Sequence, residues 1–338
     1  MTVDEFIAQW HDGSDTVEVH TSGSTGDPKV MNVEKRRMLA SARATCDFLG
    51  LKPGDTALLC MSVDYIAGKM MVVRAIERNL RLVAVEPSSH PLALPDFSDE
   101  MGKKLDFAAM VPLQVYSSLQ VPRERRILAN IRHLIIGGGP LDPSLESELR
   151  GFDGAIWHSY GMTETLSHIA LRRVSGPESS PWFTPLPGIT LSVNDDGCLV
   201  IDAPHLCPER LVTRDVVEME VEEESGLQRF KVLGRIDNVI NTGGIKIHIE
   251  QVEQALMSLI SRPFLITKCP DSRFGEVVVM LLQGTEADVP AAREACDRTL
   301  TKYARPKHIL AVPSLPMTPT GKPARQQAAI LARTLLQP

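Results

Sequence analysis

The sequence has no long apolar run and no basic segment leading into one at its N-terminus, so it predicts neither a membrane span nor a signal peptide. It also lacks a dense block of lysine and arginine, and its formal net charge of −6 argues against a nucleic-acid partner. Its six cysteines are scattered without a C-x-x-C pair. We therefore expect reduced, mostly buried thiols in a cytoplasmic protein.

Length and patterning indicate two domains of different character. A chain of 338 residues is long for one core, and 43% hydrophobic residues can build a sizeable interior. Between residues 50 and 160 apolar strands alternate with helical patterns, which predicts an α/β domain with a helix-covered, mainly parallel sheet. The expected strands are 56–61, 80–85 and 132–136, and the expected helices are 66–78 and 143–150.

The second half of the chain changes pattern twice. Residues 181–233 alternate over short runs between Pro/Gly turns, which predicts a small antiparallel β subdomain. Beyond it, a smaller α+β unit is expected, with a helix at 250–260, a strand at 277–282 and a helix at 291–301. The sequence thus divides into an N-terminal domain of residues 1–234 and a C-terminal domain of residues 235–338.

The most informative segment is Thr21-Ser22-Gly23-Ser24-Thr25-Gly26-Asp27-Pro28-Lys29. Its glycines can approach a ligand closely, and its hydroxyls and lysine can donate to phosphate oxygens. A strand expected at 16–20 and apolar residues at helical spacing from 38 to 49 place it between a strand and a helix, as in a phosphate cradle. It is not a Walker A loop, because Pro28 and Val30 occupy the positions of the second glycine and the Mg²⁺-binding hydroxyl. A solvated Gly/Ser linker is the alternative.

This loop and three later segments resemble the signatures of the AMP-forming acyl- and aryl-CoA synthetases. The later segments, in the family's order, are Tyr160-Gly161-Met162-Thr163-Glu164-Thr165, then Gly234-Arg235-Ile236-Asp237-Asn238-Val239-Ile240 with Gly243-Gly244-Ile245-Lys246-Ile247, then Pro319-Thr320-Gly321-Lys322-Pro323-Ala324-Arg325. The resemblance covers residues 21–325. It implies a large N-terminal domain, a mobile C-terminal lid, and activation of a carboxylic acid as an acyl-adenylate before a thioester with CoA forms.

The resemblance also implies a set of nucleotide contacts. It places the β- and γ-phosphates of ATP against Thr21, Ser22, Gly23, Ser24, Thr25, Gly26 and Lys29. It makes Glu164 the carboxylate for Mg²⁺, which prefers oxygen ligands, and Thr163 the hydroxyl for the α-phosphate. Tyr160 matches the aromatic residue against adenine, Asp215 the acceptor from the ribose hydroxyls, and Arg235 a second nucleoside contact. The family usually has glycine at the position before that aspartate, where this chain has Arg214.

A glycine run follows the strand expected at 132–136, where it lets the backbone approach a ligand. In the family this segment lies against adenine, here through Gly138, and against the acyl group, here through Gly137 and Gly139. A plain turn ending at Pro140 is the alternative.

Further residues with implied roles fall in the predicted lid. Lys322 resembles the lysine that bridges the acid carboxylate and the α-phosphate while the adenylate forms, although by itself it would be a solvated surface lysine. Asp237 stands at the family's hinge position. Gly243, Gly244 and Lys246 match the segment that enters the active site with CoA, although a Gly-Gly pair also suits a hairpin turn.

The acid is expected to be recognised by the helix at 66–78 and the residue before it. Tyr65 stands where many family members carry histidine, and Lys69 and Arg74 are unusual on an apolar helix. Because the two cations are five residues apart, we expect at most one to point inward. A buried cation needs an anionic partner, such as a second carboxylate of the substrate. Snorkelling of both side chains at the helix edge is the alternative.

Taken with residues 160–169, this region resembles the o-succinylbenzoate–CoA ligases of menaquinone synthesis in a short form, because typical relatives carry a much longer segment before the phosphate loop. The resemblance implies Mg²⁺ with ATP, and a small-molecule acid, ATP and CoA as partners, with a homodimer left open. The alternatives are another aryl or short-chain acid–CoA ligase, an adenylation enzyme that loads a carrier protein, and a non-catalytic nucleotide-binding module.

Overall fold

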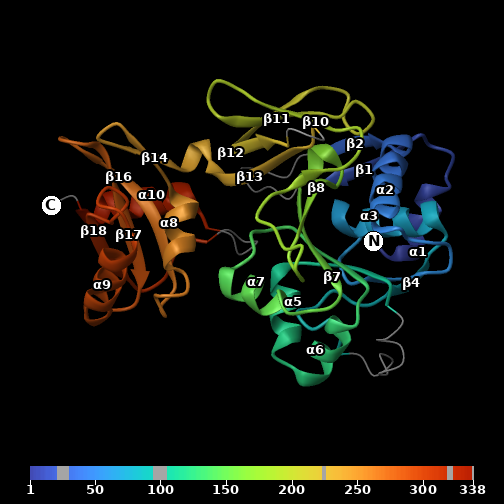
Figure 1. The fold of residues 1–338 in the computed structure, drawn as a ribbon, viewed down its shortest axis with the longest axis horizontal. Coiled ribbons are helices and arrows are strands. Elements are labelled where there is room, and N and C mark those ends of the chain that lie inside the picture. The colour runs from blue at the N-terminus through green and yellow to red at the C-terminus, as the bar shows by residue number, and fades with distance from the viewer. Residues whose placement is uncertain (21–29, 94–104, 223–225, 318–322, 337–338) are drawn as a thin grey trace.

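Four sheets flanked by helices make up the described part of the chain (Figure 1). A computed structural model describes residues 1–20, 30–93, 105–222, 226–317 and 323–336. None of the helices in these ranges has the length and hydrophobicity that a membrane span requires. All six cysteines are free and buried, as predicted.

The largest sheet has seven strands in the order β4-β3-β5-β6-β7-β8-β9. Its strands are β3 (Thr56–Leu59), β4 (Arg81–Ala84), β5 (Phe107–Met110), β6 (His133–Ile136), β7 (Ala155–Gly161), β8 (His168–Arg173) and β9 (Thr184–Pro185). Neighbours from β4 to β7 pair in parallel, and β8 and β9 join antiparallel at one edge. Every residue of β3 and β5 is buried, as parallel strands covered on both faces require. The predicted mainly parallel sheet is confirmed.

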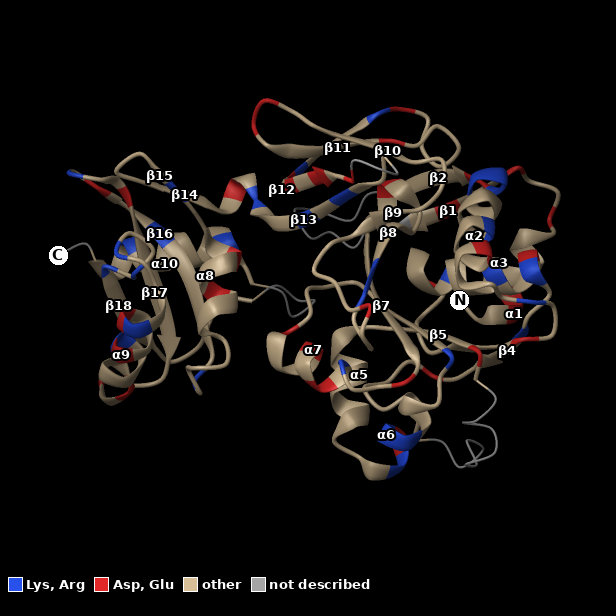
Figure 2. Cartoon of the chain, viewed as in Figure 1, with Lys and Arg blue, Asp and Glu red and all other residues tan. Residues whose placement is uncertain are grey.

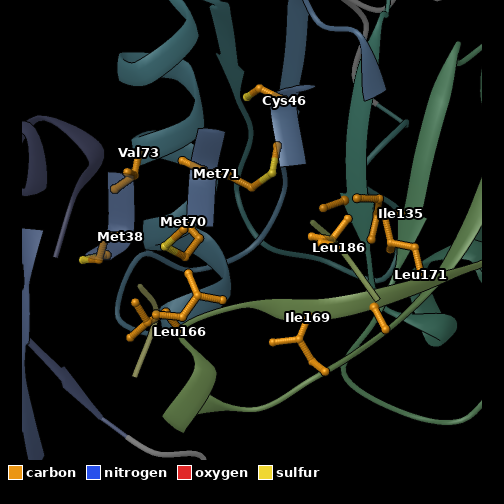
Figure 3. Packing of buried hydrophobic residues seen from close by; sticks show 14 of the residues in the cluster. Met38, Cys46, Met70, Met71, Val73, Ile135, Leu166, Ile169, Leu171 and Leu186 are labelled. Carbon is orange, nitrogen blue, oxygen red and sulfur yellow. The ribbon is translucent and has the colours of Figure 1, made fainter. Parts of the chain in front are cut away.

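Helices cover both faces of this sheet. They are α1 (Val3–Trp10), α2 (Lys35–Leu49), α3 (Ile66–Arg78), α5 (Pro112–Leu119), α6 (Pro122–Ala129) and α7 (Pro143–Leu149). Strand alternation sends Ala57 and Leu59 into a hydrophobic cluster with α2 and α3, and Leu58 into a second cluster with α5, α6 and α7. Figure 3 shows part of the first cluster, including Met38 of α2 and Met70 of α3.

A two-stranded sheet corrects one prediction about the phosphate loop. It pairs β1 (Thr16–His20) with β2 (Val30–Glu34) antiparallel, and His20 stands opposite Val30. Residues 21–29 therefore connect two strands rather than a strand and a helix, because α2 begins only at Lys35. Sequence patterning did not indicate β2, since Val33 is the only buried residue among its five.

The four-stranded sheet confirms the predicted antiparallel β subdomain. Its strands, which pair in sequence order, are β10 (Thr190–Val193), β11 (Cys198–Asp202), β12 (Leu211–Val221) and β13 (Gln228–Arg235). The register of β12 and β13 sets Asp215 directly opposite Arg235.

The elements after β13 build a further sheet with its own core. Its strands are β14 (Val239–Thr242), β15 (Ile245–His248), β16 (Phe264–Asp271), β17 (Gly275–Gln283) and β18 (His308–Val312), and its helices are α8 (Ile249–Leu256), α9 (Val289–Thr299) and α10 (Arg325–Leu336). The strand order is β15-β14-β17-β16, and β18 pairs with β17 in parallel. The buried residues here form two clusters from Ile240 onward, whereas the clusters of the earlier part end at Phe230. In Figure 1 these elements gather at one end of the molecule.

Candidate active site

A glycine loop follows β6 at the carboxyl end of the parallel strands. The Gly137 amide donates to the Met110 carbonyl at 3.1 Å, which sets the start of the loop. A Cβ on Gly137 would lie 2.5 Å from Ser159 Oγ, and Gly138 has a φ of +83°. Glycine meets both requirements without strain. The loop thus keeps its backbone open at the end of the sheet where α/β proteins bind ligands.

Three predicted nucleotide-binding residues converge from distant parts of the sequence. Tyr160, near the end of β7, donates a hydrogen bond to Asp215 Oδ2 at 2.6 Å. Asp215 on β12 faces Arg235 on β13, whose Nη1 lies 3.8 Å from Asp215 Oδ1. Burial and the Asp215 carboxylate raise the pKa of Tyr160, so the phenol stays a hydrogen-bond donor at neutral pH.

Replacing Tyr160 by phenylalanine should raise the KM for ATP about ten-fold or more with little change in kcat, because a hydrogen bond to a charged group contributes about 1.5–3 kcal/mol. The ring keeps its contacts with Phe183 and Phe230, at centroid distances of 6.0 and 5.1 Å. Steady-state kinetics with varied ATP measures the effect, and Tyr116→Phe, at an exposed position on α5, is the control. An unchanged KM in Tyr160→Phe would remove this hydrogen bond from the nucleotide site.

The turn after β7 is fixed by local constraints. A Cβ on Gly161 would lie 2.4 Å from the Ser167 carbonyl oxygen, so only glycine fits there. The Thr165 hydroxyl accepts from the backbone amide three residues before it at 3.0 Å. The buried Leu166 has a φ of +66°, a costly conformation that persists only where the surroundings impose it. These three constraints fix the position of the short 3₁₀ segment Thr163–Thr165.

Glu164 is exposed on this turn, and no hydrogen bond or ion pair within the described ranges engages it. The hydroxyl of the half-buried Thr163 stands beside it in sequence. A free carboxylate fits a nucleotide-borne Mg²⁺, because that ion takes one or two protein carboxylates and completes its octahedron with phosphate oxygens and water. The same ranges contain no cluster of three or more His, Cys, Asp or Glu side chains that could cage a metal.

Helix α3 buries both of its predicted acid-binding cations. Lys69 and Arg74 are 2% and 3% exposed, so the prediction that at most one points inward is wrong, and so is the snorkelling alternative. The reason is that every residue from 68 to 75 is buried, so α3 has almost no solvent face there. Lys69 Nζ donates to the Glu18 carbonyl at 2.6 Å and lies 5.7 Å from the centre of the Phe6 ring. The contacts of this ammonium therefore come from α1 and β1, near the N-terminus.

Arg74 has a different environment. Its Nη2 donates to Ser167 Oγ at 2.5 Å, while its buried Nε has no hydrogen-bond partner among the residues the structure describes. Burial lowers the pKa of Arg74 to about 10, so the side chain remains cationic at neutral pH. A buried guanidinium with a donor left over is suited to bind an anion.

Tyr65 is not brought together with Arg74. It is 56% exposed and lies at the N-terminal end of α3. Nine residues of helix separate the two, which is about 13 Å along the axis. The acid-binding role of Tyr65 stays a prediction.

The residues of the predicted hinge and CoA segment lie on and after β13. Asp237 forms a two-point ion pair with Arg214 of β12, with Arg214 Nε 2.5 Å from Asp237 Oδ2. Charged residues of both signs gather on β12, β13 and the turn that follows (Figure 2). Gly243 and Gly244 form the two-residue turn between β14 and β15, with φ values of +58° and +83°, so the hairpin-turn alternative describes their geometry. Lys246, on β15, is exposed.

Two groups of predicted site residues lie outside the described residues. They are the phosphate loop at 21–29 and Lys322. Flanking residues Met317 and Pro323 form an isolated antiparallel bridge. The roles of both groups stay predictions.

A mostly buried polar chain behind the glycine loop was not predicted from the sequence; it is formed by Glu146, Arg172 and His158. His158 stands two residues before Tyr160 and therefore on the same face of β7. That spacing is the one signal in the sequence that could have indicated its place near the site.

Comparison with known proteins decides the family. The profile of a family described as AMP-binding enzyme matches residues 12–204, which is more than half of the chain. This chain belongs to the AMP-binding enzymes. Among its relatives, the 2-succinylbenzoate–CoA ligase of Enterococcus faecalis is 24% identical over 332 residues, which cover 91% of this chain and 68% of that protein.

Solved structures show that this AMP-binding enzyme has the fold of its family. An acyl-CoA synthetase (AMP-forming)/AMP-acid ligase II-like protein from Dyadobacter fermentans is 34% identical, with a TM-score of 0.63 over 96% of this chain and 91% of that chain. The O-succinylbenzoate coenzyme A synthetase of Bacillus subtilis, in complex with ATP and magnesium ion, has a TM-score of 0.73 at 21% identity, over 92% of this chain and 69% of that chain.

Proposed function

We propose that this AMP-binding enzyme is an ATP-dependent acid–CoA ligase that acts on o-succinylbenzoate. The acid is joined to AMP with release of diphosphate, and the CoA thiol then displaces AMP to give o-succinylbenzoyl-CoA. The main observation behind the proposal is that Tyr160, Asp215 and Arg235 converge at the carboxyl end of β7. This strand leads into the turn that carries the exposed Glu164. Family membership supports the nucleotide chemistry, and the name of the Enterococcus faecalis relative supports the acid.

The first half-reaction is mainly a matter of positioning. A free carboxylate would have to expel oxide, whereas an acyl-adenylate expels AMP, so transfer to the α-phosphate makes the acid reactive. Catalysis of such a transfer depends on alignment and on stabilisation of phosphoryl charge. Asp215 accepts from the ribose hydroxyls, Arg235 adds a nucleoside contact, and Thr163 donates to the α-phosphate. Glu164 would hold Mg²⁺, which when bound neutralises phosphate charge.

The remaining nucleotide contacts come from three segments. Residues 21–29 donate to the β- and γ-phosphates through hydroxyls, backbone amides and Lys29. Gly138 lies against adenine, and Gly137 and Gly139 lie against the acyl group. Lys322 bridges the acid carboxylate and the α-phosphate, where it offsets charge that develops in the transition state.

The second carboxylate of o-succinylbenzoate is the part of the substrate that Arg74 would bind. The guanidinium is buried, charged at neutral pH and left with an unpartnered Nε in the described part of the site. Its partner Ser167 lies three residues after Glu164, so the cation is close to the turn that would hold the metal ion. Lys69 is the weaker candidate, because the Glu18 carbonyl already engages its ammonium.

The C-terminal elements would act as a mobile lid, with the domain boundary between residues 234 and 235 and Asp237 as the hinge. Separate hydrophobic clusters, one ending at Phe230 and the other beginning at Ile240, support this division. One orientation of the lid delivers Lys322 for adenylate formation. The other brings Gly243, Gly244 and Lys246 to CoA, so that domain movement separates the two half-reactions.

The ion pair between Arg214 and Asp237 should restrain that movement. Both side chains are largely exposed, at 61% and 43%, so the pair is weak and sensitive to salt. We expect Arg214→Ala to accelerate thioester formation about two- to five-fold at low ionic strength and to reduce the salt dependence of that step. Single-turnover kinetics at two salt concentrations measures both quantities. An unchanged rate and salt dependence would mean that the pair does not break during the cycle.

Product analysis tests the proposed function. The chain is incubated with ATP, Mg²⁺ and CoA together with o-succinylbenzoate, benzoate or acetate, and the products are identified by mass spectrometry. With o-succinylbenzoate we expect o-succinylbenzoyl-CoA and AMP in equal amounts. Preference for another acid would identify a different acid–CoA ligase, and an adenylate that CoA does not convert would identify an enzyme that loads a carrier protein. Absence of both products with every acid would contradict the proposal.

A further inference from the structure

A chain of hydrogen bonds runs from helix α7 to the glycine loop. Glu146 on α7 accepts two hydrogen bonds from the Arg172 guanidinium on β8, at 2.9 and 2.6 Å. Arg172 Nε donates to His158 Nδ1 on β7 at 3.1 Å, and His158 Nε2 lies 3.1 Å from the Gly139 carbonyl oxygen. Arg172 and His158 are 8% and 9% exposed, so water has little access to the hydrogen bond between them, whereas Glu146 is half-buried at the outer end of the chain.

The partners of His158 determine its tautomer. The Arg172 Nε–H group can only donate, so His158 Nδ1 accepts and carries no proton. The Gly139 carbonyl can only accept, so Nε2 carries the proton and donates it to the loop. Burial and the neighbouring Arg172 charge lower the pKa of His158 to about 4, which keeps the ring neutral and preserves both hydrogen bonds at neutral pH.

The glycine loop depends on such support because residues 137–139 have no side chains of their own. Ser159 Oγ donates to the Ile136 carbonyl at 3.2 Å, at the start of the loop. His158 holds the carbonyl at the other end. Since His158 and Ser159 are consecutive on β7, one strand holds both ends of the loop and leaves the peptide between them open to a ligand.

We propose that Glu146, Arg172 and His158 are positioning residues that hold the Gly139 carbonyl, and with it the glycine loop, in the shape that receives the acyl-adenylate. This rests on the proposed function, because it takes the loop as part of the adenylate site. The paired fork of Arg172 on Glu146 fixes the guanidinium, the guanidinium orients the imidazole, and the imidazole holds the loop. A loop held in its bound shape loses little conformational freedom when the nucleotide enters.

Three substitutions of His158 separate its two hydrogen bonds. Glutamine can place its amide donor near the Nε2 position, asparagine can place its oxygen near Nδ1, and phenylalanine keeps only a ring. We expect the KM values for ATP and acid to rise about five- to ten-fold in His158→Asn and His158→Phe and to stay within about two-fold of the parent in His158→Gln, with kcat little changed. Equal losses in the Gln and Asn variants, or no loss in any variant, would overturn the proposal.

Nitrogen-15 NMR of the unliganded protein tests the same chain without any substrate. The His158 signals are assigned by their loss in His158→Gln, and we expect a proton on Nε2 alone from about pH 5.5 to pH 8. Arg172→Met removes the donor to Nδ1 and should give a mixture of tautomers. A proton on Nδ1 in the parent would overturn the proposal. A different result would contradict the proposed function: the parent protein would carry the proton on His158 Nε2 but would not bind Mg-ATP in calorimetry.

Discussion

Replacing Arg74 by methionine is expected to raise the KM for o-succinylbenzoate roughly 30- to 4,000-fold, equivalent to about 2–5 kcal/mol, and to leave the KM for ATP within about two-fold of the parent. The guanidinium is buried and charged at neutral pH, so a substrate carboxylate would meet a partner with little water around it. The contact is remote from the reacting carboxylate and would contribute uniform binding, which appears in KM and not in kcat. Steady-state kinetics with each substrate varied in turn measures the effect.

Unfolding provides a second measurement on Arg74→Met, since this substitution should not lower the melting temperature of the unliganded protein. Burial disfavours the charged guanidinium, and no carboxylate in the described part of the chain offsets that cost. Replacing buried charge by apolar atoms of similar volume is often neutral or stabilising. An arginine with a purely structural role would give the opposite pair of results, a lower melting temperature and an unchanged KM for the acid.

Lys69→Met is the matched control, because Lys69 is equally buried on the same helix. Its ammonium contacts the Glu18 carbonyl and the Phe6 ring, so we expect the variant to be less stable but to keep both KM values. A larger rise in the KM for the acid in Lys69→Met than in Arg74→Met would transfer the acid-binding role to Lys69. If both variants bind o-succinylbenzoate as well as the parent, the assignment of the acid fails and another aryl acid takes its place.

Lys322→Ala is expected to slow adenylate formation by about 10²–10³-fold and to leave thioester formation from supplied acyl-adenylate largely intact. The reason is that a cation aimed at developing phosphoryl charge acts in the first transition state and would leave the site when the lid turns. Diphosphate release measures the first half-reaction, and the reaction of synthetic o-succinylbenzoyl-AMP with CoA measures the second.

Lys246→Ala is the control for this lysine, because Lys246 is an exposed lysine of the predicted CoA segment. It should slow thioester formation and leave diphosphate release unchanged. Equal losses of both half-reactions in Lys322→Ala would contradict the assignment of the lysine to one orientation of the lid.

Elements with a strong pattern of their own could be predicted closely. The helix expected at 66–78 is α3, and the strand expected at 277–282 lies within β17. Asn79 ends α3 in the left-handed conformation, which is a local property of the sequence. Helix α8 ends at Leu256, four residues before the expected end at 260, because helix ends depend on what packs against them.

Features that depend on distant packing could not be predicted. Sequence spacing suggested that Lys69 and Arg74 point in different directions, but α3 is covered on both of those sides. The cover over Lys69 comes from β1 and α1, and the contact of Arg74 comes from the turn after β7. Helical periodicity reports which residues share a face and does not report how many faces are buried.

The residues of the candidate site also fall into those that could be predicted from the sequence and those that could not. The motif positions of Tyr160, Asp215 and Arg235 could be assigned from the resemblance, and the structure brings the three side chains together across 55 positions between the first two. Glu146 and Arg172 could not be found, because in the sequence each is an ordinary charged residue. Their importance arises only when α7, β7 and β8 are packed side by side.

Exchange of labelled diphosphate into ATP, without CoA, shows whether this enzyme forms an acyl-adenylate. The reaction reports reversible formation of an acyl-adenylate and needs neither the thiol nor the second orientation of the lid. We expect exchange that requires both Mg²⁺ and o-succinylbenzoate, that falls about 10²–10³-fold in Lys322→Ala, and that persists in Lys246→Ala. A folded protein that binds ATP but catalyses no exchange with o-succinylbenzoate or any other carboxylic acid would contradict it.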